Sequence, residues 1–388
     1  MDVWKVVNLK DYGDKILPLV ELFFRQFKHP DSGNMWSTVY FRWKLINNPV
    51  GKGLLSCAIY GDEIIGTASM TLKRIWLNQI TMIGAETGDT FTNSEFSKNG
   101  KKADVYYEKN ASLPRSKEYI DVSVMGRLLY ENTQKAQEDN INIIYGTPNE
   151  QSLAGYIKKL DYYCHSDKIV HLMKPTVLFM NIILSRYFGQ LNKYGKFIIN
   201  WLYKLNKIIE NMYSKYWKFR QLSAGYSIET IGNLDESFDS FWNRIKHQYQ
   251  FSLVKDREYF CYRFIDTVHA RYSIFVLKKK HEIFGILVTR NITSSDGSKM
   301  CYIADWLIDK TRQNILTYLL SHVVNKALRD DISSFRTWVV NKNLFSAFYK
   351  LGFMKYSKTP IIFFKSDLGE QIKRLDCLDL TMAFSDSI

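Results

Sequence analysis

The sequence lacks the residue patterns on which many catalytic and metal sites are built. It contains no GxxxxGK[ST], no HExxH and no GxSxG, so a P-loop, a zinc protease and an α/β-hydrolase are all without support. The seven histidines are too scattered to suggest a metal cluster. The five cysteines are odd in number and widely separated, without a CxxC pair. This argues against a disulfide framework and against a zinc ribbon.

Long apolar runs are missing as well, and we expect no signal peptide. No stretch reaches about 18 uninterrupted apolar residues, the length that a membrane-spanning helix requires. The opening stretch, MDVWKVVNLKDYGDK, does not have the charged-then-apolar order of a signal peptide. Because the scattered cysteines also suit a reducing compartment, we expect a cytoplasmic protein.

Acidic residues are fewer than basic ones. The 388 residues include 53 Lys and Arg against 39 Asp and Glu, a net charge of +14. This balance fits an anionic ligand such as a nucleotide, coenzyme A, RNA or an acidic membrane, and it fits a solvated basic face equally well. The length and the 46% of apolar residues suit an ordinary globular chain with two domains or one large one.

An internal repeat indicates how the chain is organised. Residues 40–66 align without a gap to residues 259–285, a separation of 219 positions. Trp43 aligns with Tyr262 in this repeat. The identical aligned pairs include Tyr40/Tyr259, Phe41/Phe260, Glu63/Glu282, Ile64/Ile283 and Gly66/Gly285. Each stretch ends in an apolar strand, a polar turn and another apolar strand, which predicts a hairpin.

The elements downstream of each hairpin also match in order. Strand, helix, strand and helix are predicted at about 79–91, 122–138, 143–146 and 149–160, and again within 299–309, 312–330, 335–340 and 341–353. We therefore expect an α/β fold of two modules, residues 1–164 and 226–388. Each module is expected to hold a mixed, mostly antiparallel sheet flanked by helices.

The linker expected between the modules, residues 165–225, is basic and rich in aromatic residues. From 186 to 220 it has eight basic residues against one acidic residue, with apolar positions at helical spacing. Such helices suit packing on the modules or on a second subunit in a homodimer. Peripheral contact with a membrane surface is the alternative that the same pattern permits.

Two stretches resemble the last helix of the GCN5-related N-acetyltransferase (GNAT) fold. They are NEQSLAGYIKKLDYY from 149 and NKNLFSAFYKLGF from 341. That helix typically has an asparagine, a small residue three positions later and a tyrosine seven positions later. The first stretch has Asn149, Ser152 and Tyr156, whereas the second has Asn341 but Phe348 in place of the tyrosine.

A narrower resemblance is carried by YGTPNEQSLAGYIKKL and DREYFCYRF. These stretches resemble tandem-GNAT acyltransferases of bacterial surface-polysaccharide pathways such as O-antigen, capsule and lipopolysaccharide biosynthesis. Some members N-acylate nucleotide-linked amino sugars, including dTDP-3-amino-3,6-dideoxyhexoses. The resemblance implies an enzyme that uses acyl-CoA, in which the acyl group is acetyl or a short hydroxyacyl such as 3-hydroxybutyryl. It implies neither a metal nor a nucleic-acid partner.

The resemblance also implies roles for particular residues. The general acid that protonates the departing thiolate falls on Tyr156, and Glu86 is the candidate base at the acceptor pocket. The remaining donor-site candidates are Thr87, Asp89, Ser123, Gly126, Arg127, Asn149 and Ser152. Glu86 and Asp89 are three apart, which places them on opposite faces of a strand unless a bulge intervenes.

Several of these assignments have plain structural alternatives. The turn that cradles pyrophosphate in GNAT enzymes is glycine-rich, but its nearest match here, SVMGRL, has only Gly126, which fits a helix-packing glycine equally well. An aromatic residue would stack on the nucleotide base of the acceptor, and an arginine would bind its diphosphate. The candidates are Trp43, Arg263, Asp305 and Trp306, although Trp306 also suits a core position. Residues 97–119, an insertion absent from the second module, are expected to form a loop that covers a ligand.

Two other functions remain open at this stage. The same fold serves transferases that move amino acids from aminoacyl-tRNA to peptidoglycan precursors, and the charge of +14 suits them. The second function is that of a non-catalytic module whose basic linker docks on a membrane or a partner.

Overall fold

The computed structural model describes residues 4–26, 35–93, 123–176 and most of 201–385. Within the last range, positions 202–203, 205–207, 209–210, 214, 295 and 328–329 lie outside the description. The expected insertion at 97–119 also lies outside it, as does much of the basic segment 186–220. No helix of the described part is long and apolar enough to cross a membrane.

The structure confirms the internal repeat residue by residue. Helix α3 (Thr38–Phe41) and its π-helical continuation at 42–46 correspond to α11 (Arg257–Phe260) and 261–265. Strands β2 (Leu54–Tyr60) and β9 (Ser273–Lys279) begin and end at aligned positions. The next strands, β3 (Glu63–Leu77) and β10 (Glu282–Thr293), also begin at aligned positions. Two copies of one backbone pattern therefore underlie the chain.

The other elements complete each half in the same order. In the N-terminal half they are β1 (Lys5–Asn8), α2 (Leu17–Arg25), β4 (Ile80–Thr92), α6 (Val124–Glu138), β5 (Ile143–Gly146), α7 (Glu150–Lys159) and β6 (Tyr162–Pro175). In the C-terminal half they are β7 (Ser227–Ile231), α10 (Ser237–Ile245), β8 (Phe251–Leu253), β11 (Lys299–Ile308), α12 (Ile315–Ala327), β12 (Ile332–Val339), α13 (Phe345–Tyr349), β13 (Met354–Phe364) and α14 (Asp367–Lys373).

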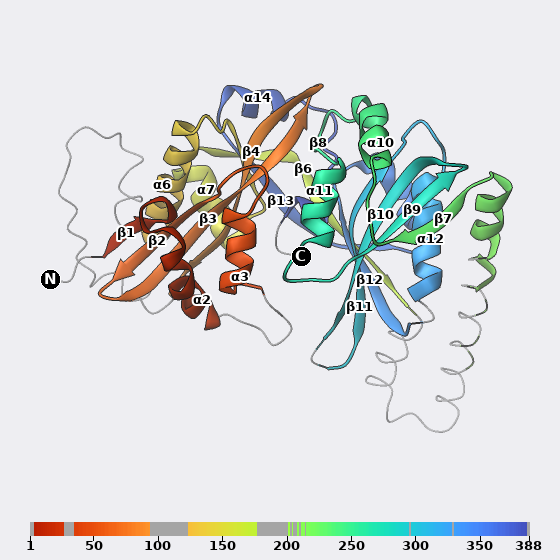
Figure 1. The fold of residues 1–388 in the computed structure, drawn as a ribbon, viewed down its shortest axis with the longest axis horizontal. Helices are drawn as coiled ribbons and strands as arrows, with labels where there is room; N and C mark the ends of the chain where they lie inside the picture. The colour runs from red at the N-terminus through yellow and green to blue at the C-terminus, as the bar shows by residue number, and fades with distance from the viewer. Residues whose placement is uncertain are drawn as a thin grey trace.

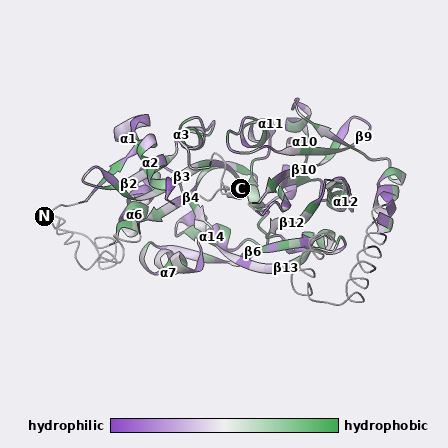
Figure 2. Ribbon diagram, turned by 90° about the horizontal axis from the view of Figure 1, so that it is seen from below, coloured by the Kyte–Doolittle hydropathy of each residue, from purple (hydrophilic) through white to green (hydrophobic). Residues whose placement is uncertain are grey.

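Helices cover both faces of the strands in each half. The apolar side of α2 and α3 packs on one face of β2 and β3, and α6 and α7 pack on the other. In the C-terminal half, α10 takes one face and α12 with α13 the opposite face. Figure 2 shows α2, α3, α10 and α11 along one side of the molecule and α6 and α7 on the other.

The two halves share one 13-stranded sheet rather than forming two separate sheets (Figure 1). The order is β1-β2-β3-β4-β5-β13-β6-β12-β11-β10-β9-β7, and β8 pairs with β3 outside this path. Strand β13 thus lies between β5 and β6 of the N-terminal half, and β6 lies between β13 and β12. Residues 165–175, expected to begin the linker, are in fact part of β6.

Side chains at the junction reinforce this exchange of strands. The Arg74 guanidinium donates to both carboxylate oxygens of Asp256, at 2.8 and 2.7 Å, and the Trp76 indole N–H donates to the Tyr249 carbonyl at 3.0 Å. The bidentate geometry fixes orientation more tightly than a single contact would. Paired strands, paired charges and packed rings together join the halves into one body.

We expect Ile362→Ala to lower the free energy of unfolding by about 2–5 kcal/mol, because Ile362 is fully buried in β13 against the strand ends at Gly146 and Cys164. Both halves should unfold in a single transition that moves to lower denaturant. Circular dichroism and tryptophan fluorescence during urea unfolding measure this. The exposed Val39→Ala variant should change stability by less than about 0.5 kcal/mol. Two separate transitions, only one of them shifted, would contradict the shared sheet.

Candidate active site

In the N-terminal half, β4 and β5 lie side by side for only a short distance. Residues 84–86 pair in parallel with 143–145, after which β5 ends at Gly146 while β4 continues to Thr92. The pairing of β4 with β3 shifts register near Asp89, whose φ is 45°. A bulge of this kind bends a strand away from its neighbour. Among the described strands, none pairs with β4 on the β5 side beyond Glu86.

The C-terminal half has the same opening in the equivalent place. Strand β11 pairs in parallel with β12 from Lys299 to Tyr302 and then continues to Ile308. Its pairing with β10 also shifts register, between Val288 and Thr289. Each half therefore presents an open strand edge, bordered by the helix that follows the strand.

Tyr156 places its hydroxyl at the opening of the N-terminal half. Its ring is 4% exposed and packs edge-on against Tyr162, with ring centroids 5.1 Å apart. The hydroxyl oxygen lies 3.4 Å from Oγ1 of Thr87, the first residue of β4 beyond the paired stretch. Asn149 caps α7 by accepting a hydrogen bond from the Ser152 backbone N–H at 2.9 Å, as the sequence suggests. This cap sets the start of the helix that carries the phenol.

Gly146 allows β5 to end directly against Thr87. A Cβ atom at Gly146 would lie 2.5 Å from Cγ2 of Thr87, closer than side chains approach one another. The last residue of β5 must therefore be glycine if Thr87 is to keep its place beside Tyr156. The sequence shows this glycine, but only the structure shows what it accommodates.

Glu86 lies on the opposite face of β4 from Thr87, because side chains alternate along a strand. It is 5% exposed and lies 3.6 Å from the Lys73 ammonium on β3. The two residues predicted to act in catalysis, Glu86 and Tyr156, thus flank β4 from its two faces. A reacting group at the open edge of the strand would be accessible to both.

Asp89 is held by protein donors around the bulge. One carboxylate oxygen accepts from the Trp36 indole N–H at 3.1 Å, and the other accepts from Lys44 Nζ at 2.7 Å and Ser69 Oγ at 2.9 Å. Its main-chain carbonyl accepts from the Thr67 hydroxyl at 3.0 Å. These contacts stabilise the bulge that opens the edge. A direct contact of Asp89 with a ligand stays a prediction.

Ser123, Gly126 and Arg127 form the first turn of α6, next to the opening. The Ser123 hydroxyl accepts from the Gly126 N–H at 3.2 Å, which caps the helix. Gly126 is therefore at the start of the helix and not in its middle. The Arg127 guanidinium pairs with Glu131 at 2.6 Å one turn later. A helix N-terminus attracts anions, so a phosphate contact here remains a reasonable prediction.

Trp43 and Arg263, predicted to bind substrate, meet at the junction of the two halves. The Trp43 ring stacks on Tyr262, its partner in the repeat, with centroids 4.9 Å apart, and the Tyr262 hydroxyl donates to the Trp43 carbonyl at 3.0 Å. The Arg263 guanidinium lies 5.7 Å from the Trp43 ring and donates to the Ser385 carbonyl at 2.8 Å. Both side chains are buried, so these contacts stabilise the interface of the repeats.

Asp305 and Trp306 lie inside the C-terminal half. The Asp305 carboxylate is fully buried, forms an ion pair with Lys255 and accepts from the hydroxyls of Tyr259 and Thr381 at 2.7 Å. Trp306 packs in the apolar core, 5.5 Å from the Phe348 ring. Trp306 thus occupies the core position that the sequence left open as its alternative. Contacts of either residue with substrate stay predictions.

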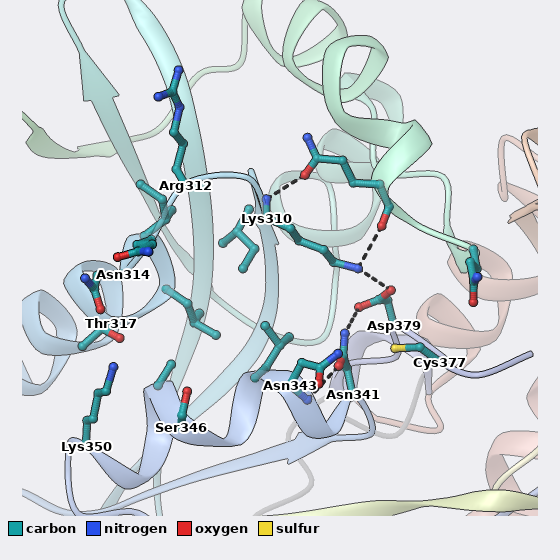
Figure 3. A pocket seen from close by; sticks show the side chains of 18 of the residues that line it. Lys310, Arg312, Asn314, Thr317, Asn341, Asn343, Ser346, Lys350, Cys377 and Asp379 are labelled. Atoms are coloured by element: carbon teal, nitrogen blue, oxygen red, sulfur yellow. Dashed lines mark hydrogen bonds and ion pairs between the residues drawn. The ribbon is translucent and has the colours of Figure 1, made fainter.

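A cavity of about 770 Å³ lies at the open edge of the C-terminal half (Figure 3). Its wall is formed by the residues after β11, the first residues of α12, α13 and a segment of the C-terminal tail. Figure 3 shows Lys310 crossing the cavity to Asp379, whose carboxylate it contacts at 2.6 Å. Burial and the Asp379 charge raise the pKa of the neighbouring Cys377 thiol to about 12, so this thiol is not a nucleophile near neutral pH.

Arg312 and Lys350 line the cavity, and neither has an ion-pair partner among the described residues. Lys350 extends from the end of α13 toward Thr317 and Asn314 at the start of α12 (Figure 3). Amide side chains, among them Asn314, Asn341 and Asn343, line the same space. This combination suits an anionic ligand with hydroxyl or amide groups.

The sequence analysis did not identify this cavity. It predicted acceptor binding at Trp43, Arg263, Asp305 and Trp306 instead. The stretch DKTRQNIL holds Lys310 and Arg312, and it lacks the glycines expected of a phosphate-binding turn. The available signal was one cation just before the predicted helix and one at its first residue. Lys350 and the tail segment at 376–379 are distant from that stretch in sequence, and only the tertiary structure brings them beside it. Among the described residues, no group of three or more His, Cys, Asp or Glu is arranged to hold a metal ion.

Solved structures with the same fold cover nearly the whole chain. A GCN5-related N-acetyltransferase from Anabaena variabilis is 11% identical over 93% of this chain and 72% of its own, with a TM-score of 0.56. N-myristoyltransferase from Saccharomyces cerevisiae, solved with bound myristoyl-CoA, is 12% identical over 93% of this chain and 78% of its own, with a TM-score of 0.55.

A third solved structure is the GCN5-related glucosamine N-acetyltransferase region of a fungal multi-domain β-N-acetylglucosaminidase. It is 9% identical, covers 94% of this chain and 38% of that one, and has a TM-score of 0.56. No protein-family model and no curated protein matches the sequence. The chain has the GNAT fold in two tandem copies.

We expect Gly146→Ala to destabilise the protein by about 1–3 kcal/mol, because its added methyl group would push against Thr87 at the strand separation. Gly232→Ala is the matched control, since a Cβ at Gly232 meets nothing within 4 Å. Urea denaturation of both variants measures the difference. Equal stabilities would show that β5 does not end in tight contact with Thr87.

Proposed function

We propose that this protein is an acyl-CoA-dependent N-acyltransferase that acylates the amino group of a nucleotide-linked amino sugar. The observation that carries the proposal is the Tyr156 hydroxyl beside Thr87, at the point where β4 separates from β5. The fold supports it, since N-acetyltransferases and an N-myristoyltransferase with bound myristoyl-CoA share it. Acetyl or a short hydroxyacyl group is the proposed cargo.

The chemistry follows from groups on the two faces of β4. With the thioester at the open edge of the strand, main-chain N–H groups are available to stabilise the tetrahedral oxyanion. The amine nitrogen forms a bond to the carbonyl carbon, and the carbon–sulfur bond breaks. Glu86, directly or through a water molecule, takes the proton of the amine on one face. Tyr156 donates a proton to the departing thiolate on the other and regains one from solvent.

The pyrophosphate of the donor is assigned to the first turn of α6. Ser123, Gly126 and Arg127 border the opening there, and the helix N-terminus attracts negative charge. Asn149 and Ser152 contribute by capping α7, which holds Tyr156 in place.

We assign the diphosphate of the acceptor to the cavity of the C-terminal half. Arg312 and Lys350 supply cations there. Its wall residue Asp379 precedes Phe384 by five residues, and Phe384 stacks on Tyr145 with centroids 3.8 Å apart. Asp379 in the cavity wall is therefore no more than about 18 Å from Phe384, which is the length of five extended residues. Tyr145 pairs in register with Glu86.

The C-terminal half does not offer a second acid. Phe348 occupies the position equivalent to Tyr156, is fully buried and has no hydroxyl to donate. This is why the reaction is assigned to the N-terminal half. A donor bound in the C-terminal cavity is the competing arrangement, favoured by that cavity's size and its unpaired cations. An amino sugar as acceptor is also in line with the glucosamine N-acetyltransferase region that has the same fold.

The Tyr156→Phe variant should lose about 10²-fold in turnover with little change in the apparent KM for acyl-CoA, because it removes a proton donor but keeps the ring packing. Release of free coenzyme A, followed with a thiol reagent, measures this with acetyl-CoA or 3-hydroxybutyryl-CoA and dTDP- or UDP-linked amino sugars. Tyr12→Phe, an exposed tyrosine on the surface, is the control. Full turnover in Tyr156→Phe would remove this residue as the acid.

Failure of the wild-type protein to release coenzyme A with any donor and acceptor pair would overturn the proposed activity itself. Transfer from aminoacyl-tRNA to a peptidoglycan precursor, without any use of acyl-CoA, would support the tRNA-dependent alternative.

Lys350→Glu should raise the apparent KM for the nucleotide-linked acceptor at least about tenfold and leave that for acyl-CoA unchanged, since it replaces a cavity cation by an anion. Lys280→Glu, an exposed lysine in the turn between β9 and β10, is the matched control. Steady-state kinetics with each substrate varied in turn measures both values. A rise only in the apparent KM for acyl-CoA would place the donor in this cavity instead.

A further inference from the structure

A helix with an exposed apolar face lies at the outer end of the C-terminal half. Residues 201, 204, 208, 211–213 and 215–223 are helical, and we call these positions the outer helix. Figure 1 and Figure 2 place its last turns at the far end of the molecule from the N-terminal half. Phe219 is 68% exposed and Met212 66%, unusually high values for such side chains.

The exposed apolar residues share one face of the helix. Positions 201, 208, 212, 216, 219 and 222 follow one another at steps of seven, four, four, three and three, which is the spacing of a single helical stripe. All of them are large and exposed, namely Trp201, Ile208, Met212, Tyr216, Phe219 and Leu222. From Met212 to Leu222 the described side chains of the stripe follow one another over about three turns, so they are not a scatter of single side chains.

The opposite face of the outer helix is anchored on the protein. Trp217 is 6% exposed, belongs to the core of the C-terminal half and packs edge-on against Tyr318 of α12. The Gln221 side chain donates to the Tyr226 carbonyl at 3.0 Å. The helix is thus fixed in an orientation that directs its apolar stripe away from the protein.

Basic side chains lie along the stripe. Lys204, Lys215, Lys218 and Arg220 are exposed, and none of them forms an ion pair with another described residue. The sequence from 186 to 220 has eight basic residues and one acidic residue. An apolar stripe bordered by unpaired cations is the pattern of helices that lie in the interface of an anionic bilayer. Tryptophan and tyrosine are also favoured at that depth.

A second copy of this chain is the weaker occupant of the face. In a two-fold dimer the same surface patch meets itself, so the cations of one helix would be brought against those of the other. An anionic partner neutralises them instead. We propose that the outer helix docks the protein on an anionic lipid surface, with Met212, Tyr216 and Phe219 inserted among the headgroups. This inference does not depend on the acyltransferase reaction.

Co-sedimentation of the full chain with vesicles tests the proposal. Binding is expected to vesicles of phosphatidylcholine mixed with phosphatidylglycerol, and it should fall as salt is added. Pure phosphatidylcholine vesicles should bind at least tenfold more weakly. Lys215→Gln combined with Lys218→Gln should weaken binding to the anionic vesicles by roughly fivefold per residue. Equal binding to both vesicle types, or none to either, would overturn the proposal.

A matched pair of variants separates the stripe from general effects of charge. Phe219→Glu should abolish vesicle binding, whereas Leu22→Glu, which adds the same charge at a 59% exposed leucine on α2, should reduce it far less. Both positions are exposed, so both variants should keep the wild-type unfolding midpoint. Equal loss in the two variants would contradict a role for the stripe. A dimer in light scattering that Phe219→Glu dissociates, without vesicle binding by the wild type, would assign the face to a second copy.

Discussion

The insertion of β13 between β5 and β6 is the constraint on which the rest of the structure depends. Strand β13 belongs to the second copy of the repeat by sequence, yet it completes the sheet of the first. Strand β6 in turn pairs with β12 of the second. Because each half lacks a strand that the other supplies, neither has a closed set of hydrogen bonds alone. The open edges of β4 and β11 can therefore persist, since the sheet is stabilised at its centre.

A shared backbone carries different chemistry in its two copies. The N-terminal copy has a phenol, Tyr156, at its strand separation, and the C-terminal copy has Phe348 there together with a large cavity. Trp43 and Tyr262, which are equivalent in the repeat, stack on each other at the junction. In the proposed function one copy transfers protons and the other holds an anionic group, and the stacked pair joins the two copies.

The sequence predicted the parts of the fold that local patterns determine. Hairpins and a gapless repeat follow from the alternation of apolar and polar residues and from the 219-residue spacing. The exchange of β6 and β13 was not predictable, because a strand's sequence does not state which neighbour it pairs with. The one-sheet architecture therefore appeared only in three dimensions.

The candidate site divides in the same way. Asn149, Ser152 and Tyr156 were identifiable because they lie close together in the sequence on one helix. Asp305 and Trp306 were candidates for binding the acceptor, but Asp305 is buried against the C-terminal tail and Trp306 against α13. The cavity was missed because Arg312 and Lys350 come from segments that only tertiary folding brings together. Contacts distant in sequence, rather than residue types, were the missing information.

A crystal structure with a non-hydrolysable acyl-CoA analogue bound tests the central claim most directly. We expect the thioester position at the edge of β4, between Glu86 and Tyr156, with the pyrophosphate at the first turn of α6. Density for the analogue in the cavity lined by Arg312 and Lys350, with the edge of β4 empty, would contradict it.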